Sequence, residues 1–557
     1  MDETILQIRN LTVDLPPWAD RPQAVSGANL ELRRNEILCV VGESGSGKSV
    51  MARAIMGLLP APHLRASSGS ILLEGEDLLK VSPARMRSIR CSRISMIFQE
   101  PMTALNPVKT IGVQIDEVLA LHTDLPRRER TKRIVAMMES VSLSDPLRLI
   151  RAYPHQISGG QRQRAMIAMA LILEPPVVIA DEPTTALDVT TQSQILALIR
   201  QIQSSRHMGV LFITHDFGVV AEIADRVAVM QQGKLVEFGD AQQVLNAPQH
   251  SYTRLLIAAV PGLTPRESVL NSDALPVLSV NALDKKYRDS SGFFGRRSRT
   301  VHAAQTVTLS VRRGETLGLV GESGSGKSTL ARCIARLIDA DSGSVVLRDV
   351  DLMKLSRRQL RSHRKYIQMV FQDPYGSLDP RRTVGKLIAE GPIVHGMPET
   401  EAFARAYSLL ELVGLDRRAA ERYPHEFSGG QRQRIGIARA LALEPEILVA
   451  DEAVSALDVS VQAQVLRLLA DIRDRFNLTM LFITHDLRVA AQVCDSIAVM
   501  RYGTIVEYGS TASVYAAPQH PYTQELFAAI PGRHWHAPVS AFSDGVDFSN
   551  EPTIRSV

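Results

Sequence analysis

Two glycine-rich stretches have the composition and spacing of a loop that binds phosphate. The nine residues GESGSGKSV at Gly42–Val50 recur as GESGSGKST at Gly321–Thr329, each between an apolar stretch and a run of helix-forming residues. Glycine lets the backbone fold closely around an anion, so that N–H groups and the dipole of the following helix face it. In each copy the lysine would reach the β and γ phosphates, and the next serine would place a hydroxyl on Mg²⁺. The residues predicted to bind nucleotide here are Gly42, Glu43, Ser44, Gly45, Ser46, Gly47, Lys48, Ser49 and Val50 in the first half, and Gly321, Glu322, Ser323, Gly324, Ser325, Gly326, Lys327, Ser328 and Thr329 in the second, with Ser49 and Ser328 on the metal.

A pair of adjacent carboxylates closes an apolar stretch in each half, in the contexts VVIADEP and ILVADEA. At the end of a buried strand, two carboxylates can divide the work of hydrolysis. The first supports hydrated Mg²⁺, and the second polarises the attacking water. An isolated Asp-Glu pair is often only a solvated turn, but here a phosphate loop precedes each one. The pattern predicts Asp181 and Asp451 as metal ligands and Glu182 and Glu452 as catalytic residues.

Glutamine and histidine side chains follow apolar strands at matching places in the two halves. Gln99 and Gln372 would coordinate Mg²⁺ or water through the amide oxygen, and this role depends on the other motifs. His215 and His485 both follow the sequence LFIT, where a strand runs out towards the ligand. A lone histidine there is more often structural, but duplication with identical neighbours favours contact with the γ-phosphate. All four are predicted catalytic residues.

A second type of helix start also occurs twice, as SGGQ. Serine can cap the helix that follows, and the two glycines leave backbone N–H groups open to an anion. One nucleotide does not need both helix starts of one domain, so the simplest arrangement is head-to-tail, with ATP between the phosphate loop of one half and the SGGQ of the other. The residues predicted to contact ATP in this way are Ser158, Gly159, Gly160 and Gln161, and Ser428, Gly429, Gly430 and Gln431.

The repetition extends along the whole chain of 557 residues. Matching positions are 279 residues apart at the phosphate loops and 270 residues apart from SGGQ onward, a period that indicates two domains rather than a solenoid. The predicted order is a first domain at 1–262, a linker at 263–276, a second domain at 277–532 and a polar tail at 533–557. In each domain, short apolar strands alternating with helices predict an α/β fold with a mainly parallel sheet.

Composition narrows the class of protein. The net charge of +4 is small for this length and makes no electrostatic case for nucleic-acid binding. The four cysteines are far apart, which argues against a disulfide framework or a zinc site. The longest apolar stretch, Ala165–Leu173, is well short of the roughly 20 residues that span a bilayer, so membrane association is expected only through partners.

The combination of motifs resembles the ABC-transporter ATPase family over nearly the whole chain. In the terms of that family, the motifs are the Walker A loop, the Q-loop, the SGGQ signature, Walker B with its glutamate, the D-loop (Asp188, Asp458) and the H-loop. FQEPMTALNP at Phe98–Pro107, FQDPYGSLDPR at Phe371–Arg381 and the closing segments APQHSYTRLLIAAVPG and APQHPYTQELFAAIPG resemble the branch that imports oligopeptides, dipeptides, nickel and opines. The resemblance implies two fused P-loop ATPase domains, each with a mainly parallel core sheet, a helical subdomain and an antiparallel β part.

The resemblance also implies function and partners. The chain would bind and hydrolyse ATP with Mg²⁺ at the cytoplasmic face of a bacterial inner membrane, as a peripheral subunit attached through two permease subunits. A periplasmic or extracellular substrate-binding protein would act indirectly. The helical segments Pro101–His155 and Pro374–His425 are expected to contact the permeases.

Three features depart from the family pattern. The proline after the catalytic glutamate is Pro183 in the first half but Ala453 in the second. The aromatic residue that stacks on adenine is predicted to be Tyr287 in the second half, whereas in the first half Leu15 takes its place, with Trp18 three residues later. Some relatives ligate an iron–sulfur cluster after the closing segment, but no cysteine lies in 263–276 or 533–557, so no cluster is expected.

Other readings remain open. A transporter of the same kind could import glutathione, opines, nickel chelates or sugars instead, because the ATPase chain does not contact the cargo. A soluble tandem ATPase that acts on ribosomes or DNA is the alternative from another class. Such proteins usually have a long charged helical linker or zinc-binding inserts, and this chain has neither pattern.

Overall fold

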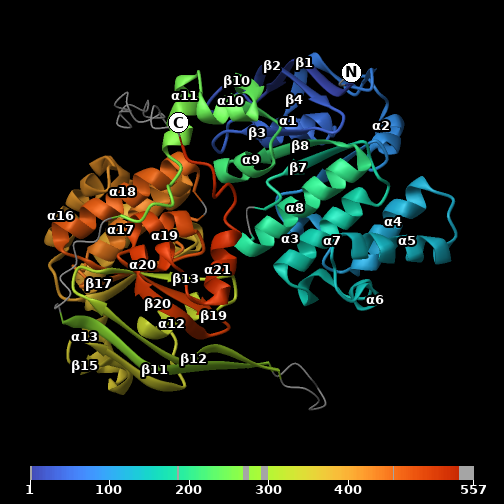
Figure 1. Cartoon of the computed structure of the whole chain (residues 1–557). Helices are drawn as coiled ribbons and strands as arrows, with labels where there is room; N and C mark the ends of the chain where they lie inside the picture. The colour runs from blue at the N-terminus through green and yellow to red at the C-terminus, as the bar shows by residue number, and fades with distance from the viewer. Residues whose placement is uncertain (1–2, 185–186, 267–274, 290–298, 456, 538–557) are drawn as a thin grey trace. The chain divides into compact units, whose positions relative to one another are not determined.

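The chain forms two compact units in a computed structural model that describes residues 3–184, 187–266, 275–289, 299–455 and 457–537. The first unit contains Met1–Val260 with Ala529–Val557, and the second contains Pro261–Ala528. Figure 1 shows the element order along the chain. The predicted linker lies largely outside the described residues, as does the tail beyond residue 537.

The core of the first unit is a six-stranded sheet in the order β10-β9-β3-β8-β7-β6. Strands β9, β3, β8, β7 and β6 run parallel, and β10 pairs antiparallel with β9. Every residue of β3, β6, β7 and β8 is buried, as expected for parallel strands covered on both faces. The strands are β3 (Ile37–Val41), β6 (Ile94–Ile97), β7 (Val177–Asp181), β8 (Gly209–Thr214), β9 (Arg226–Gln231) and β10 (Lys234–Asp240).

A second, antiparallel sheet in the order β2-β1-β4-β5 covers one side of this core. Its inward residues join α1 and the core strands in one cluster that includes Leu6, Val40 and Met51. The opposite side of the core sheet packs in a cluster that includes Ile115, Met138 and Val210. The elements of the antiparallel part and the first helix are β1 (Thr4–Asp14), β2 (Gln23–Arg33), β4 (Arg65–Leu73), β5 (Glu76–Asp77), α1 (Lys48–Ile55) and α2 (Pro83–Ile89).

Helices fill the segment between β6 and β7. Figure 1 shows α4, α5 and α6 side by side in teal, apart from the blue strands β1, β2 and β4. Proline or serine starts several of them, and Ser158 caps α7. The helices are α3 (Pro101–Ala104), α4 (Ile111–His122), α5 (Arg127–Ser140), α6 (Pro146–Leu149), η1 (Pro154–Gln156) and α7 (Gly159–Leu171), followed after β7 by α8 (Val189–Arg206), α9 (Phe217–Ile223), α10 (Ala241–Asn246) and α11 (Ser251–Ala258).

The second unit repeats this plan. Its core sheet has the order β16-β17-β18-β13-β19-β20 and its antiparallel sheet the order β12-β11-β14-β15. The strands are β11 (Pro276–Asp289), β12 (Arg299–Arg312), β13 (Thr316–Val320), β14 (Ser342–Leu347), β15 (Val350–Asp351), β16 (Ile367–Val370), β17 (Ile447–Asp451), β18 (Thr479–Thr484), β19 (Ser496–Arg501) and β20 (Thr504–Ser510). The helices are α12 (Lys327–Ile334), η2 (Leu352–Lys354), α13 (Arg357–His363), η3 (Arg364–Tyr366), α14 (Pro374–Ser377), α15 (Val384–Val394), α16 (Glu399–Leu412), η4 (Arg417–Glu421), η5 (Pro424–Glu426), α17 (Gly429–Leu441), α18 (Val459–Phe476), α19 (Leu487–Val493), α20 (Thr511–Ala516) and α21 (Pro521–Ala528).

The predicted fold class is confirmed in both units: a mainly parallel core sheet, a helical part and an antiparallel β part. The end of the chain differs from the plan of two consecutive domains, because Ala529 and the residues after it group with the first unit. There the Gly532 N–H donates to Oε2 of Glu222 at 3.1 Å, and Trp535 packs against the first core. In the described part of the chain, no helix is long and apolar enough to cross a membrane.

Candidate nucleotide-binding sites

The predicted phosphate loop of the first unit connects β3 to the start of α1. Gly42 and Gly47 have positive φ angles of 149° and 104°. A Cβ on Gly42 would lie 2.2 Å from the Met230 carbonyl oxygen, and one on Gly47 would lie 2.4 Å from that of Ala24. These two glycines are therefore required by packing as well as by conformation. The second loop has the same two close approaches.

The lysine of each loop is buried and holds the loop in its curved shape. Nζ of Lys48 donates to the carbonyl oxygens of Gly42 at 2.7 Å and Glu43 at 2.8 Å. Lys327 makes the same two hydrogen bonds in the second unit, at the same distances. A buried ammonium surrounded by carbonyl oxygens at the start of a helix favours an anion beside it. This is the geometry expected of a phosphate loop.

The serine after each lysine meets the first carboxylate of the Asp-Glu pair. Oγ of Ser49 donates to Oδ1 of Asp181 at 2.9 Å, and Oγ of Ser328 donates to Oδ1 of Asp451 at 2.8 Å. Burial is the largest influence on these carboxyl groups and raises their pKa. The serine hydrogen bond opposes this rise, and the neighbouring glutamate adds to it. A cation would stabilise the charged form of each aspartate.

These oxygen donors fit Mg²⁺, which prefers hard oxygen ligands and commonly binds through one or two carboxylates together with substrate phosphates. The described residues contain no group of three or more His, Cys, Asp and Glu side chains that could hold a metal by themselves. A metal at Ser49 and Asp181, or at Ser328 and Asp451, would therefore take its remaining ligands from water and phosphate.

The second carboxylate of each pair is surrounded by the predicted glutamine and histidine. Nε2 of Gln99 donates to Oε2 of Glu182 at 2.9 Å, and Nδ1 of His215 lies 3.4 Å from the same oxygen. In the second unit, Gln372 donates to Glu452 at 2.7 Å, and Nδ1 of His485 lies 3.4 Å from its carboxylate. Three residues that lie far apart in the sequence therefore meet at one edge of each core sheet. The glutamine contacts the glutamate through its amide nitrogen, and its predicted Mg²⁺ contact would use the amide oxygen.

Both glutamates have an unusual backbone conformation. Glu182 has φ 46° and Glu452 has φ 47°, in the left-handed region that non-glycine residues rarely adopt. The backbone N–H of Glu182 donates to the Ile213 carbonyl oxygen at 3.0 Å, and that of Glu452 donates to Ile483 at the same distance. Such a conformation costs about 1–3 kcal/mol and persists where the surroundings enforce it, often at functional sites. It turns the side chain out of the strand direction towards glutamine and histidine.

The charges of the second site are coupled. Burial by itself opposes charge on His485, but the hydrogen bond and the negative charge of Glu452 outweigh it and raise the pKa of His485 above its ordinary value of 6.5. Burial likewise opposes charge on Glu452, and the contributions of His485 and Lys327 reverse this and lower its pKa. The contact thus favours the charged forms of both groups, carboxylate on Glu452 and imidazolium on His485.

The two SGGQ segments start the helices α7 and α17. Oγ of Ser158 accepts the Gln161 N–H at 3.3 Å, and the Gln161 side chain accepts the Ser158 N–H at 3.1 Å, so the two side chains form a capping box. Ser428 and Gln431 repeat it. The second glycine is required for packing, since a Cβ on Gly160 would lie 2.9 Å from Thr191 of α8. A Cβ on Gly159 would meet nothing within 4 Å, so its own unit does not explain that glycine.

The predicted adenine contacts lie on exposed surfaces. Tyr287 is 46% exposed on β11, and Nζ of Lys285 lies 5.5 Å from the centroid of its ring. Trp18 is 77% exposed and lies edge-on to His63, with 6.1 Å between ring centroids. Arg21, which sequence reasoning did not single out, donates from Nη2 to the Gly45 carbonyl of the phosphate loop.

Two further residues that sequence reasoning missed touch the phosphate loops. The hydroxyl groups of Tyr252 and Tyr522 accept the backbone N–H of Glu43 and Glu322. Both tyrosines belong to the closing segments, about 200 residues after the loops. The duplicated YT of these segments was the available signal, but nothing in the sequence says which element it faces.

Comparison with known proteins agrees with this geometry. The family model described as ABC transporter matches residues 25–185 and 304–455. The model described as oligopeptide/dipeptide transporter, C-terminal region, matches residues 236–299 and 506–539. The chain is 48% identical to a glutathione import ATP-binding protein of Shigella boydii serotype 4, over 95% of this chain and 89% of that protein. It is 47% identical, with the same coverage, to the protein of that name from Escherichia coli K12.

Solved structures of single cassettes also match. The dimeric structure of a post-hydrolysis state of the ATP-binding cassette MJ0796, bound to ADP and Pi, is 28% identical. The match covers 42% of this chain and 98% of the MJ0796 chain, with a TM-score of 0.38.

Proposed function

Because the chain belongs to the ABC-transporter ATPase family, in its oligopeptide/dipeptide importer branch, we propose that it energises solute import through two permease subunits in a bacterial inner membrane. The chain is an ATPase with two ATP-binding cassettes. The observation that carries the proposal is that both units place lysine, serine, aspartate, glutamate, glutamine and histidine around one sheet edge. Both units therefore contain the full set of groups that we propose to carry out hydrolysis.

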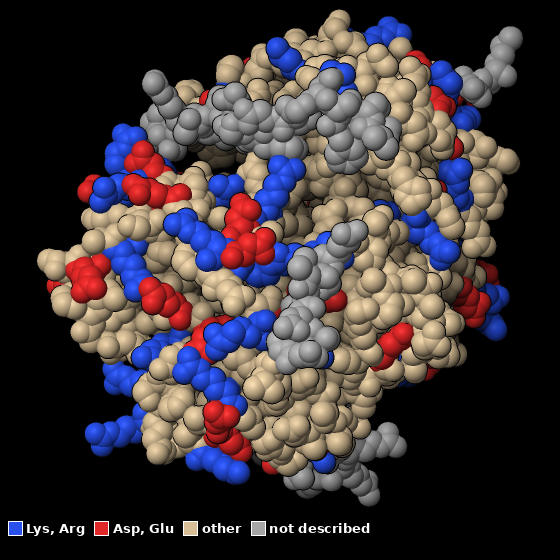
Figure 2. All heavy atoms as spheres, turned by 60° about the vertical axis from the view of Figure 1, so that its left-hand side comes forward, with Lys and Arg blue, Asp and Glu red and all other residues tan. Residues whose placement is uncertain are grey.

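The proposed cargo is a small peptide or peptide-like solute. The closing segments match the C-terminal region of oligopeptide and dipeptide transporters, and relatives nearly half identical over most of the chain are named for glutathione import. Glutathione is therefore the first cargo to test. On the face drawn in Figure 2, acidic side chains lie among the basic ones.

Each composite site would combine the residues of one unit with the SGGQ of the other. In one site, Lys48 would hold the β and γ phosphates, Glu182 would take the proton of the attacking water, and Gln99 and His215 would fix that carboxylate. The second unit would complete this site with Ser428–Gln431. In the SGGQ of the first unit, a Cβ on Gly159 would meet nothing within 4 Å, which supports an arrangement in which an anion from elsewhere approaches such a helix start. Bound Mg²⁺ would supply charge neutralisation for the phosphates.

The other site would use the same groups of the second unit with the SGGQ of the first. It consists of Lys327, Gln372, Glu452 and His485, with Ser158–Gln161.

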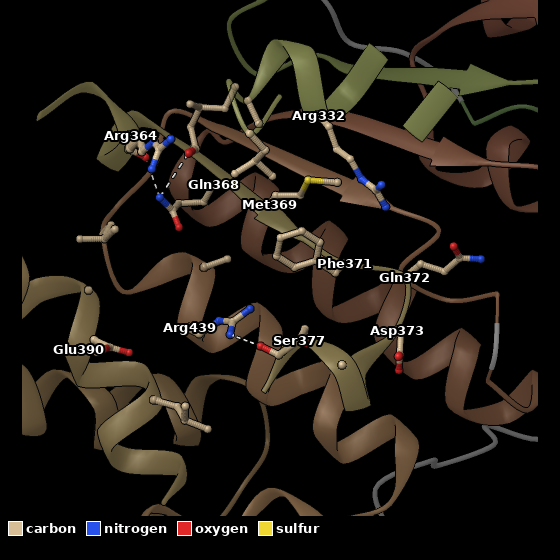
Figure 3. A pocket seen from close by; sticks show the side chains of 18 of the residues that line it. Arg332, Arg364, Gln368, Met369, Phe371, Gln372, Asp373, Ser377, Glu390 and Arg439 are labelled. Atoms are coloured by element: carbon tan, nitrogen blue, oxygen red, sulfur yellow. Dashed lines mark hydrogen bonds between the residues drawn. The ribbon is translucent and has the colours of Figure 1, made fainter. Parts of the chain in front are cut away.

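A groove next to Gln372 is the proposed permease contact of the second unit. It is a pocket of about 780 Å³ between the end of β16 and the helices α15 and α17. Figure 3 shows Arg439 of α17 reaching Ser377 of α14, and the hydrogen bond from its guanidinium to the Ser377 carbonyl is 2.5 Å long. The groove therefore includes both the glutamine that contacts Glu452 and the helix that SGGQ starts. A permease segment bound in this groove would be displaced when either Gln372 or α17 moves.

The two units offer different surfaces for this contact. The groove of the second unit is lined by Arg332, Arg364 and Arg439, which lie with Glu390 and Asp373. In the sequence repeat, Cys91 and Met169 of the first half occupy the positions of Arg364 and Arg439. The second groove thus has two more cationic side chains, which favours a more acidic partner segment. This difference supports two non-identical permeases, with the chain held at the cytoplasmic face of the membrane only through them.

Uptake of labelled glutathione and of a labelled tripeptide tests the proposed function. Cells that carry this chain with its neighbouring permease and binding-protein genes should accumulate label, and the double variant Glu182→Gln/Glu452→Gln should not. A matched control is Glu174→Gln, an exposed glutamate between α7 and β7 that lies outside the segments expected to contact the permeases. Unchanged uptake in the double variant, or no uptake of either solute by the wild type, would refute the proposal.

A further inference from the structure

We infer that the closing segment of each cassette is a working part of its own ATP site, through one tyrosine hydroxyl that holds the phosphate loop: Tyr252 in the first unit and Tyr522 in the second. The inference rests on the proposed role of Gly42–Val50 and Gly321–Thr329 as phosphate loops. The inference assigns a role in nucleotide binding to the closing segments, which match the C-terminal region of oligopeptide and dipeptide transporters. Both tyrosines are positioning residues, because they touch the loop rather than the reacting atoms.

The contact is made to the same peptide group in both units. The Tyr252 hydroxyl accepts the N–H of Glu43 at 3.3 Å and donates to the Glu43 carboxylate at 3.1 Å. The Tyr522 hydroxyl accepts the N–H of Glu322 at 3.1 Å. The rings are 7% and 1% exposed, so the hydroxyl groups are fixed by packing. The same contact with the loop backbone therefore occurs in both cassettes.

The tyrosine and the loop lysine act on one residue from two sides. In the first unit, the N–H of Glu43 meets Tyr252 while its carbonyl oxygen meets Nζ of Lys48 at 2.8 Å. The residue is thereby fixed at both its N–H and its carbonyl group, next to Gly42 with its enforced positive φ. Since the loop N–H groups must all face one anion, the orientation of this residue governs how well the rest of the loop is aligned.

The sequence around each tyrosine explains why it reaches the loop. In the first unit, the carboxylate of Glu237 accepts the N–H groups of Gln249 at 2.7 Å and His250 at 3.1 Å, which fixes the turn before α11. Nδ1 of His250 then accepts the Tyr252 N–H at 3.2 Å and caps the helix. The glutamine and histidine of the PQHxY motif thus fix the turn, the histidine caps the helix, and the tyrosine projects from its first turn.

The second unit repeats this support. Glu507 accepts the N–H groups of Gln519 at 2.8 Å and His520 at 3.0 Å, and His520 caps the helix of Tyr522. Burial opposes charge on Glu507, but these backbone hydrogen bonds outweigh it and lower its pKa. The carboxylate is therefore charged at neutral pH and holds the turn.

The substitutions Tyr252→Phe and Tyr522→Phe remove only the hydroxyl groups and keep the buried rings. Each should weaken Mg·ATP binding at its own site about fivefold, the equivalent of one hydrogen bond of about 1 kcal/mol at 1.4 kcal/mol per tenfold. Because the Tyr252 hydroxyl contacts the backbone and the carboxylate of Glu43 in the loop, we expect its loss to change affinity and to leave the single-turnover rate at saturating ATP within about twofold of the parent. This separation of affinity from rate distinguishes positioning from catalysis.

Binding is measured on the full chain with one site disabled at a time. Tyr252→Phe is tested in the Lys327→Ala background, and Tyr522→Phe in the Lys48→Ala background, with labelled ATP and Mg²⁺ as the probe. Tyr508→Phe is the matched control, because its hydroxyl donates to the Ser310 carbonyl at 3.2 Å, away from the loop. Unfolding midpoints without nucleotide are compared for all variants.

Weaker binding in both loop variants, with the control and the unfolding midpoints unchanged, supports the inference. Affinity within about twofold of the parent at either site overturns it, as does an equal loss in Tyr508→Phe or a loss that follows a lowered unfolding midpoint. The lysine variants test the underlying assignment separately. If Lys48→Ala and Lys327→Ala each still bind two nucleotides as tightly as the wild type, the loops themselves are misassigned.

Discussion

Replacing Glu452, the proposed catalytic glutamate of the second site, by glutamine tests whether both sites hydrolyse ATP. In Glu452→Gln the side chain keeps its shape but loses its charge and one acceptor oxygen. Loss of a general base costs about 10²–10⁴-fold in rate. At 1.36 kcal/mol per tenfold, this is about 3–5 kcal/mol of transition-state stabilisation. Since the first unit has the same set of groups, Glu182→Gln should cause a loss of the same order.

The structure adds a second observable to this substitution. Glu452 accepts from Gln372 at 2.7 Å and lies 3.4 Å from Nδ1 of His485, and a glutamine has only one oxygen for these two neighbours. The oxygen should remain with Gln372, the closer donor. His485 then loses the hydrogen bond and the charge of Glu452, which both raise its pKa, while the charge of Asp486 still raises it and burial still lowers it. The pKa of its imidazole should therefore be lower in the variant than in the wild type.

Three measurements check this prediction: steady-state ATPase, the count of trapped nucleotide, and the titration of His485 by NMR. Each single variant should retain ATP at its own site. If closure requires both sites, each should also depress turnover at the intact partner, so the two losses will not add. Glu401→Gln, on the exposed face of α16, is the control for loss of a carboxylate. Near-normal turnover in Glu452→Gln with severe loss in Glu182→Gln would show that the second site only binds ATP. An unchanged His485 titration would refute the pairing.

Three further outcomes are expected. Because the pKa of His485 is raised in the fold, its pairing with Glu452 stabilises the fold fully below about pH 6.5, and this stabilisation is lost as the pH rises through the folded pKa. The difference in Tm between wild type and His485→Gln should therefore shrink from about pH 6 to pH 9. A constant difference would contradict this prediction. Tyr287→Ala should weaken ATP binding more than Trp18→Ala, on the scale of about 1–3 kcal/mol known for base stacking, and equal losses in a binding titration would decide against the stacking assignment. Anaerobically purified protein should be colourless, and stoichiometric iron and sulfide would overturn the expectation of no cluster.

Much of the site follows from the sequence because its chemistry is local. A phosphate loop needs glycine, lysine and serine within nine consecutive residues, and those residues are the same in both halves except for the last. The strand before each loop is an unbroken apolar run, so the α/β class and the position of the loop at a strand end could both be predicted. Duplication also predicted His215 and His485 as site residues, and the structure places each of them beside the glutamate of its unit. The assignment to the peptide-importer branch also follows from local motifs, and the family comparisons confirm it.

Other features depend on contacts between segments that are far apart in the chain. The left-handed backbone of Glu182, the hydrogen bond from Arg439 to the Ser377 carbonyl, and the grouping of Ala529 and later residues with the first unit have no signature in their own sequence windows. The hydroxyl of Tyr252 meets Glu43 across 209 residues, and only the packing of α11 against the phosphate loop brings them together. Residue types determine which chemistry is available, because that depends on functional groups a few positions apart. Tertiary structure decides which groups act on one another, because hydrogen bonds of about 3 Å depend on the position of whole helices and strands.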